Sequence, residues 1–180
     1  MERGADLHPF LGYNLRISEL HAAVGLAQIR KLDTFLAIQR KHNQILRSHM
    51  EQVPGISFRM VPDPSGDSAS FLSWFLPSQA HTEKAIEALK AAGIFAGNFY
   101  WFANNWHYIK KWDHLKNVQS LYALNDAQQN ALKKLQTVEF NASDSIMSRC
   151  VSTAISLVWT EEQVHAKGAQ FLKVLKEALS

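Results

Sequence analysis

The amino-acid sequence predicts an α+β fold, in which helices pack on one face of a small antiparallel sheet and a long helical segment precedes it. Residues 18–52 keep a helical spacing of apolar residues. Two short apolar segments, at 56–61 and 70–76, flank a loop rich in proline, as a pair of antiparallel strands does. The chain has 180 residues, of which 47% are hydrophobic and 19% charged, so it is long enough for one compact domain with its own core.

The N-terminal region divides into an irregular arm, residues 1–17, and a helical segment, residues 18–53, that we expect to form an association surface. Proline and glycine interrupt the arm, and Ser18 is placed to cap the first helix. The apolar residues of this helix spread over more than one stripe, which predicts burial on two sides, between its own domain and a partner. A second helical pattern follows and ends at residues 54–55.

Residues 54–180 form the predicted α+β domain. The helix at 82–92 is expected to end at Gly93, because glycine readily adopts the left-handed conformation that closes a helix. Thr160 and Gln163 form a capping box that opens the last helix. The expected elements are, in order, strands at 56–61 and 70–76, a helix at 82–92, a strand at 94–99, an aromatic-rich connection at 100–124, a short helix at 126–135, a helical turn and strand within 146–157, and the final helix.

Charge and composition narrow the classes of partner. The 19 basic and 16 acidic residues are scattered and give a net charge of +3, so we expect neither nucleic acid nor a membrane as a partner. No stretch approaches the roughly 18 apolar residues of a membrane span, and the N-terminus shows no apolar signal segment, which favours a cytoplasmic protein. Cys150 is the only cysteine, which excludes an internal disulfide, and we expect it to be a buried apolar residue.

The histidines do not form a recognisable metal site. His42 and His49 lie seven residues apart, as do His107 and His114, and neither spacing matches a standard zinc pattern. We therefore predict no metal ligands in this chain.

Two stretches resemble a known enzyme family. Residues 12–33, GYNLRISELHAAVGLAQIRKLD, resemble the signature of the DegT/StrS-like sugar aminotransferases, G-x-N-x-R followed by a helix that begins Glu-Leu. Residues 145–163 resemble the family's last strand and final helix, and they are most similar to its octulosonate-type members, which aminate an eight-carbon sugar acid. The resemblance implies the small C-terminal domain of a fold type I aminotransferase that depends on pyridoxal phosphate.

The resemblance also assigns candidate cofactor contacts. Asn14 resembles the asparagine that reaches across the dimer to the phosphate of the neighbouring subunit's cofactor, Arg16 resembles the arginine at that shared site, and Tyr13 lies beside them. An amide donor and a guanidinium suit a phosphate or a sugar carboxylate. The alternative is structural: Asn14 and Arg16 cap the first helix and pair with Glu19.

No catalytic residue is expected in this chain. Transamination needs a lysine that forms a Schiff base with the cofactor aldehyde, and the resemblance places that lysine upstream of the Asn-x-Arg motif. The lysines present, such as Lys31, Lys41, Lys84 and Lys173, fall mostly on polar helix faces. We therefore expect no cofactor on the chain alone, and pyridoxal phosphate only where a large-domain partner completes the site.

A segment rich in aromatic and basic residues, 98–114, contains the candidate ligand contacts Trp101, Trp106, His107 and Lys110. Rings interleaved with cations can stack on a sugar or on a base of single-stranded nucleic acid. The alternative is that these rings fill the core or a dimer interface. The resemblance places the segment on the substrate side, and both interpretations stay open.

Three functional hypotheses follow. In the first, the chain is an orphan or truncated aminotransferase domain that is non-catalytic alone and acts as an oligomerisation or ligand-binding module. In the second, it is one half of a split aminotransferase, completed by a chain with the large domain. In the third, it binds a sugar phosphate or similar anion through Arg16 and the loop from Trp101 to Trp112. The apolar first helix must be covered, which predicts a homodimer through residues 10–50.

Overall fold

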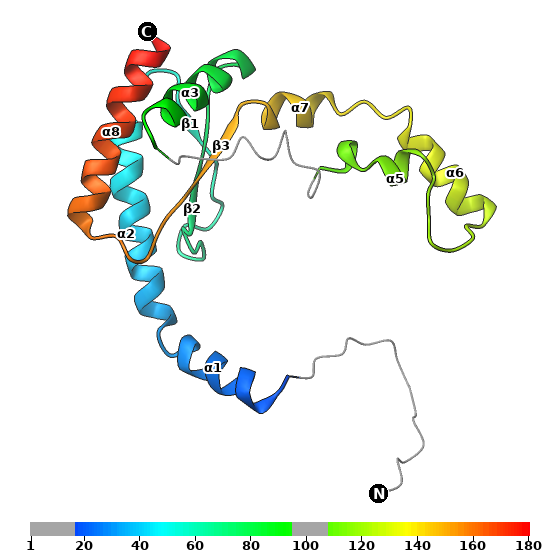
Figure 1. The fold of residues 1–180 in the computed structure, drawn as a ribbon, viewed down its shortest axis with the longest axis horizontal. Helices are drawn as coiled ribbons and strands as arrows, with labels where there is room; N and C mark the ends of the chain where they lie inside the picture. Colours follow the sequence, from blue (N-terminus) through cyan, green and yellow to red (C-terminus); the bar gives the residue numbers. More distant parts are fainter. Residues whose placement is uncertain (1–16, 95–107) are drawn as a thin grey trace, which may run out of the picture. The chain divides into compact units, whose positions relative to one another are not determined.

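The computed structural model describes residues 17–94 and 108–180, and the chain groups into two compact units. The first unit, Met1–Phe35, contains helix α1, and the second, Leu36–Ser180, contains the sheet and the remaining helices, labelled in Figure 1. No helix in the described ranges is both long and apolar enough to cross a lipid bilayer.

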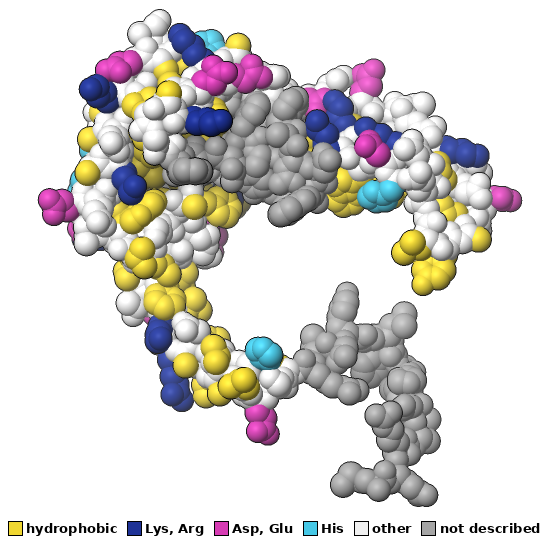
Figure 2. All heavy atoms as spheres, viewed as in Figure 1, with side chains coloured by type: hydrophobic (Ala, Val, Ile, Leu, Met, Phe, Trp, Pro, Cys, Tyr) yellow, Lys and Arg dark blue, Asp and Glu magenta, His cyan; other side chains and the backbone are white. Residues whose placement is uncertain are grey.

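Helix α1, Glu19–Ile29, is capped as predicted but buries none of its own side chains. The Ser18 hydroxyl accepts a hydrogen bond from the backbone amide of His21 at 3.3 Å, which satisfies one free donor of the first turn. Leu20 is 73% exposed and Ile29 is 64% exposed. The expected burial on two sides is therefore not realised within the described part of the chain, and Figure 2 shows hydrophobic side chains along α1 open to solvent.

Helix α2, Leu32–Met50, is amphipathic, and from Leu36 onward it belongs to the second unit. The stripe expected from the sequence is buried at His42, Leu46 and Met50, which are spaced four residues apart and so lie on one face. This apolar face attaches α2 to the core of the second unit.

The sheet has three antiparallel strands in the order β1, β2, β3. Strand β2, Phe71–Phe75, is central and confirms the strand predicted at 70–76. It pairs with β1, Ser57–Phe58, on one side and with β3, Cys150–Ala154, on the other. Strand β3 confirms the short strand predicted within 146–157.

Strand β1 is shorter than the strand predicted at 56–61, so that prediction was wrong in its extent. The Arg59 amide still donates to the Ser73 carbonyl at 3.1 Å, but the chain then leaves the sheet. Pro62 and Pro64 carry no amide hydrogen for a neighbouring strand, so the chain cannot resume a regular pairing with β2 at these positions.

Helix α3, Gln79–Ala91, begins three residues before the predicted start at Thr82. Ser78 supplies the N-cap, and its hydroxyl accepts a hydrogen bond from the amide of His81 at 3.3 Å. The helix ends as predicted at Gly93, whose φ of +69° is the left-handed conformation that closes a helix.

Short helices make up the region that follows. The strand predicted at 94–99 lies outside the described residues from 95 onward. Helix α6 coincides with the predicted helix at 126–135, and Asn125 and Gln128 form its capping box. The elements of this region are η1 (Ile109–Lys111), α5 (Asp113–Lys116), α6 (Asp126–Leu135) and α7 (Asn141–Met147).

The C-terminal helix α8, Glu161–Leu179, opens with the predicted capping box. The Thr160 hydroxyl accepts from the Gln163 amide at 3.2 Å, and the Gln163 side chain accepts from the Thr160 amide at 2.9 Å. A single stripe of residues is buried or half-buried along the whole helix: Val164, Gly168, Phe171, Leu172, Leu175 and Leu179.

Helices α2, α3 and α8 cover one face of the sheet, as predicted. On that face Trp74 is fully buried, and its indole nitrogen donates to the Thr153 hydroxyl at 3.1 Å. On the opposite face Ser73 and Ser152 share a hydrogen bond of 3.0 Å. The core comprises Leu46, Met50, Val53, Leu72, Trp74, Leu76, Ala85, Leu89, Val151, Ile155, Val164, Phe171 and Leu175.

Candidate functional site

One carboxylate joins two residues at the described end of the aromatic segment. Asp144 on α7 accepts a hydrogen bond from the Tyr108 hydroxyl at 2.6 Å, through Oδ1, and forms an ion pair with the Lys110 ammonium through Oδ2. Tyr108 is only 5% exposed, and its ring packs edge-on against Phe140 with the centroids 5.8 Å apart. These contacts fix the chain where it enters η1, and we call Tyr108, Lys110 and Asp144 the Asp144 cluster.

The electrostatics of the Asp144 cluster favour one protonation state. Burial, and then the hydrogen bond to Asp144, raise the pKa of Tyr108 to about 12. Hydrogen bonds from Lys110 and Tyr108 hold the pKa of the Asp144 carboxyl below its ordinary value of 3.8. At neutral pH the carboxylate is therefore ionised and the phenol protonated.

This arrangement suits binding rather than proton transfer. A phenol with a raised pKa is a poor acid and a poor base near neutrality. Lys110 uses one of its three N–H donors for Asp144, and its side chain is 42% exposed, so the ammonium remains accessible to a ligand. The cluster can present a fixed cation to an anionic or hydroxyl-rich ligand beside the aromatic segment.

Of the candidate ligand contacts, Lys110 alone lies in the described part of the chain. The structure brings it together with Tyr108 and Asp144. The other ligand and cofactor candidates lie outside the described residues: Tyr13, Asn14, Arg16, Trp101, Trp106 and His107.

Sequence reasoning missed Tyr108 and Asp144 as partners of Lys110. Asp144 is 34 residues from Lys110 and 36 from Tyr108, so no local spacing links them. The one available signal is a lone acidic residue in the helical turn predicted just before the last strand. Nothing in that pattern identifies which cation it meets.

All the lysines of the chain lie in the described residues, and none of them is buried. Lys41 pairs with Glu161 at 2.6 Å, and Lys110 pairs with Asp144. Lys167 is only half-buried, and its side-chain nitrogen lies 4.9 Å from the centre of the Trp159 ring, in a cation–π contact. A Schiff-base lysine needs an amine in an enclosed site, and none of these three ammonium groups lies in one within the described residues.

The histidines and the cysteine have structural contacts. His42 is buried with Nδ1 at 3.1 Å from the Ser156 carbonyl, and His49 meets His165 at 3.2 Å, so the two histidines seven residues apart do not share a site. Cys150 is buried as predicted, and that burial raises the pKa of its thiol.

A sequence profile of the DegT/DnrJ/EryC1/StrS aminotransferase family matches residues 2–167, nearly the whole chain. This chain belongs to that family. The resemblance carried by residues 12–33 and 145–163 is thereby confirmed.

Individual relatives agree with the family. A dTDP-4-amino-4,6-dideoxy-D-glucose transaminase of Shigella dysenteriae is 30% identical over 97 residues, which is 51% of this chain and 25% of that protein. The crystal structure of 3-amino-5-hydroxybenzoic acid synthase superposes with a TM-score of 0.58 at 18% identity, covering 99% of this chain and 42% of the other. The fold is thus that of an aminotransferase, and this chain spans less than half the length of either relative.

Proposed function

We propose that this aminotransferase-family chain provides the small domain of a sugar aminotransferase and is non-catalytic by itself, acting as an oligomerisation and ligand-binding module in the cytoplasm. The observation that carries the proposal is the family match over residues 2–167 together with the absence of any buried lysine, all the lysines lying in the described residues. Chemistry at the substrate carbon then requires a lysine from a large domain.

Association is supported by the exposed surface of α1. With about 100° of rotation per residue, Leu20 and Val24 fall on one face of the helix, and Leu26 and Ile29 fall on the opposite face. All four side chains are more than half exposed. An apolar surface on both sides of a helix marks a site of association. We propose a homodimer through residues 10–50 that covers one of these faces.

The cofactor of the family, pyridoxal phosphate, supplies an electron sink at the substrate carbon when it is bound. The described residues do not make a complete site for it, because no lysine is enclosed. We propose that Asn14, Arg16 and Tyr13 contribute its phosphate contacts across the dimer, an amide, a guanidinium and a hydroxyl being suitable donors for a phosphate. The ring-binding groups and the Schiff-base lysine would belong to the large domain.

We propose that the Asp144 cluster contributes to the substrate side. Asp144 holds Lys110 as a cation at the end of the segment that contains Trp101, Trp106 and His107. A sugar substrate would stack on the indole rings and meet the Lys110 ammonium with its hydroxyl or carboxylate groups. We thus assign binding of the sugar to this chain, and the transamination chemistry to the large domain.

Sedimentation equilibrium tests the association. Leu20→Glu places an unpaired charge in the proposed interface and is expected to weaken the dimer by at least about tenfold. Leu121→Glu, at a side chain that is 96% exposed outside residues 10–50, is the matched control and should leave the dimer unchanged. A chain that is monomeric at every concentration contradicts the proposal, and so does equal weakening by both variants.

A second candidate function is one half of a split aminotransferase. The second apolar face of α1, at Leu26 and Ile29, favours it, because one homodimer contact covers only one side of a helix. Coexpression with the large-domain portion of a family member should give a complex with transaminase activity. Ile29→Glu should abolish the complex while the homodimer persists. If no complex forms with the wild-type chain, this candidate fails.

A third candidate, binding of a sugar phosphate or similar anion by the chain alone, depends on Arg16 and the loop from Trp101 to Trp112. Its test is equilibrium binding of a sugar phosphate to the wild-type chain and to Arg16→Ala. A reduction of about tenfold is expected for the loss of one charged hydrogen-bonding group. Unchanged affinity in the variant would count against this site.

A further inference from the structure

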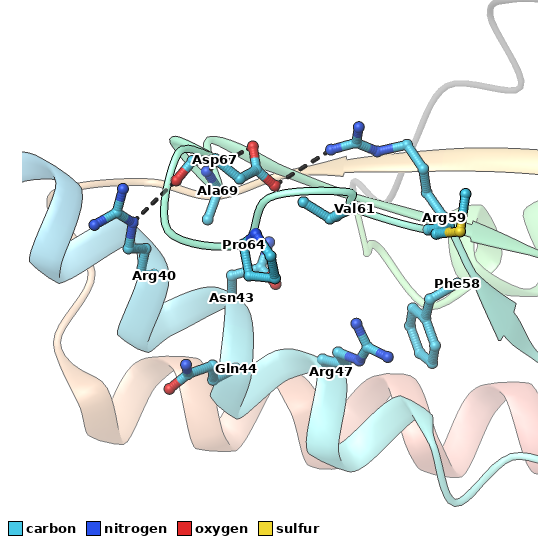
Figure 3. Close-up of a pocket in the computed structure, with 11 residues that line it drawn as sticks. Arg40, Asn43, Gln44, Arg47, Phe58, Arg59, Val61, Pro64, Asp67 and Ala69 are labelled. Carbon is cyan, nitrogen blue, oxygen red and sulfur yellow. Dashed lines mark hydrogen bonds and ion pairs between the residues drawn. The ribbon is translucent and has the colours of Figure 1, made fainter.

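A cleft on the second unit shares no residue with the Asp144 cluster or with the proposed cofactor and ligand contacts, although its α2 residues fall within residues 10–50. It opens between α2 and the loop that joins β1 to β2, and its volume is about 390 Å³ (Figure 3). Clefts of roughly 300–1,000 Å³ are the usual size for small ligands. The lining combines arginine side chains with apolar side chains.

Arg40 holds the loop that forms one wall of the cleft. Its Nε donates to the Asp67 carbonyl at 2.9 Å, and its Nη2 donates to the Ser65 carbonyl at 2.5 Å. Both acceptors are neutral, so these bonds leave the positive charge in place. The charge of Arg40 also attracts the Asp63 carboxylate, but that carboxylate already accepts hydrogen bonds from the Ser65 hydroxyl at 2.6 Å and from backbone amides.

Arg47 offers the donors that a ligand would meet. Its Nε donates to Glu51 at 2.7 Å, and its guanidinium lies over the Phe58 ring, 4.5 Å from the centroid. The two Nη groups make no hydrogen bond in the described part of the chain. Figure 3 shows the guanidinium directed away from α2 toward Phe58, at the edge of the cleft. A planar fork that is anchored at one end and open at the other suits an oxyanion.

The rest of the lining adds charge and apolar surface. Arg59, on the loop side, reaches the Asp67 carboxylate only at 3.3 Å. Three guanidinium groups and one carboxylate line the cleft, and the Glu51 carboxylate, which pairs with Arg47 from outside the lining, offsets part of the excess positive charge. Phe58, Val61 and Pro64 supply apolar side chains to the lining. An occupant must therefore combine a negative charge with an apolar body.

We propose that this cleft binds a small organic anion, a phosphate ester or carboxylate attached to a flat apolar body. The anionic group pairs with the open fork of Arg47, and Arg59 adds to the attraction. The body packs on Val61, Pro64 and the part of the Phe58 ring that the Arg47 guanidinium leaves uncovered. This site goes beyond the proposed function, because it needs no large domain, no cofactor and no residue of the N-terminal arm.

The test titrates the whole chain, isotope-labelled for NMR, with phenyl phosphate, inorganic phosphate and phenol. Phenyl phosphate should saturate and shift the backbone amide signals of residues 43–47 and of the non-proline residues within 58–67. Its Kd should be at least about tenfold lower than that of inorganic phosphate or of phenol. Only the ester combines a charge for the arginines with a ring for the apolar side chains of the lining. Shifts elsewhere in the chain, or no saturation below about 10 mM, would overturn the proposal.

Two variants separate the cleft from general charge attraction. Arg47→Gln should weaken binding of phenyl phosphate by about tenfold, whereas Arg30→Gln, the same loss of charge on the surface beside α1, should not. Phe58→Leu keeps the charges and should remove most of the preference for phenyl phosphate over inorganic phosphate. Equal weakening by both arginine variants, or an undiminished preference in Phe58→Leu, would contradict the site.

Discussion

The Cα of Gly168 on α8 lies directly against the imidazole of His49 on α2. A Cβ added to Gly168 would fall 2.4 Å from Cδ2 of His49 and 3.1 Å from its Cβ, so turning the ring alone would not make room. His49 also contacts His165 at 3.2 Å, which further restricts the ring. The close approach of α2 to α8 therefore depends on glycine at this position.

Gly168→Ala is expected to lower the free energy of unfolding by about 1–2 kcal/mol, because the cost of overpacking exceeds the helix propensity gained by alanine. Denaturant unfolding followed by circular dichroism measures it. Gly25→Ala, also within a helix but with nothing within 4 Å of the added Cβ, should not lower the unfolding midpoint. A Gly168→Ala chain as stable as wild type would show that the two helices are free to separate.

Gly93→Ala isolates a different effect, that of the backbone. Gly93 has a φ of +69°, and nothing lies within 4 Å of an added Cβ, so only the left-handed conformation opposes a side chain. We expect a loss of about 1 kcal/mol in the free energy of unfolding. Gly93→Asn should recover part of it, because asparagine tolerates this conformation. Equal stability of all three chains would contradict the assigned end of α3.

Asp144→Asn should reduce the free energy of unfolding at neutral pH by about 1–2 kcal/mol, since it weakens two charge-assisted hydrogen bonds in a partly exposed site. The pKa of the Asp144 carboxyl is lower in the fold than its ordinary value of 3.8. Its stabilisation is thus present above that value and is lost as the pH falls through the folded pKa. The difference between the two chains should shrink in acid.

The matched control is Asp113→Asn, whose carboxylate is 80% exposed and lies 3.9 Å from Lys116. Such a pair should contribute almost nothing. The stabilisation that Tyr108 contributes depends on pH in the opposite direction, because its pKa is raised from 10.0 to about 12. Its contribution to the free energy of unfolding is complete below pH 10.0 and is lost as the pH rises through the raised pKa. An Asp144→Asn effect that is independent of pH would rule out an ionised partner.

Much of the fold is predictable because helix caps and helical stripes depend on residues that lie within four positions of each other in the sequence. The capping boxes at Asn125 and Thr160, the Ser18 cap and the buried stripe of α8 are of this kind. The short β1 and the contacts of Lys110 are not, because they depend on residues far along the chain. The cleft between α2 and the loop that joins β1 to β2 is the clearest case. Arg40 donates to the carbonyl of Asp67, 27 residues along the chain, and no local sequence pattern predicts that hydrogen bond.

Cys150 should react slowly with a thiol reagent in the native state. It is buried on β3, and burial raises the pKa of its thiol, which lowers the fraction of reactive thiolate. Native chain is expected to react at least about tenfold more slowly than chain unfolded in guanidinium, where the thiol is accessible. Equal rates in the two states would place Cys150 at the surface and contradict the position of β3.

The most direct test of the central claim, that this chain does not carry its own cofactor lysine, is borohydride reduction of the purified chain with pyridoxal phosphate, followed by peptide mapping. We expect no stoichiometric adduct, only slow and scattered labelling of exposed lysines such as Lys31 and Lys84. A stoichiometric adduct at one lysine, Lys110 or Lys167 for example, would contradict it and would make this chain an aminotransferase site by itself.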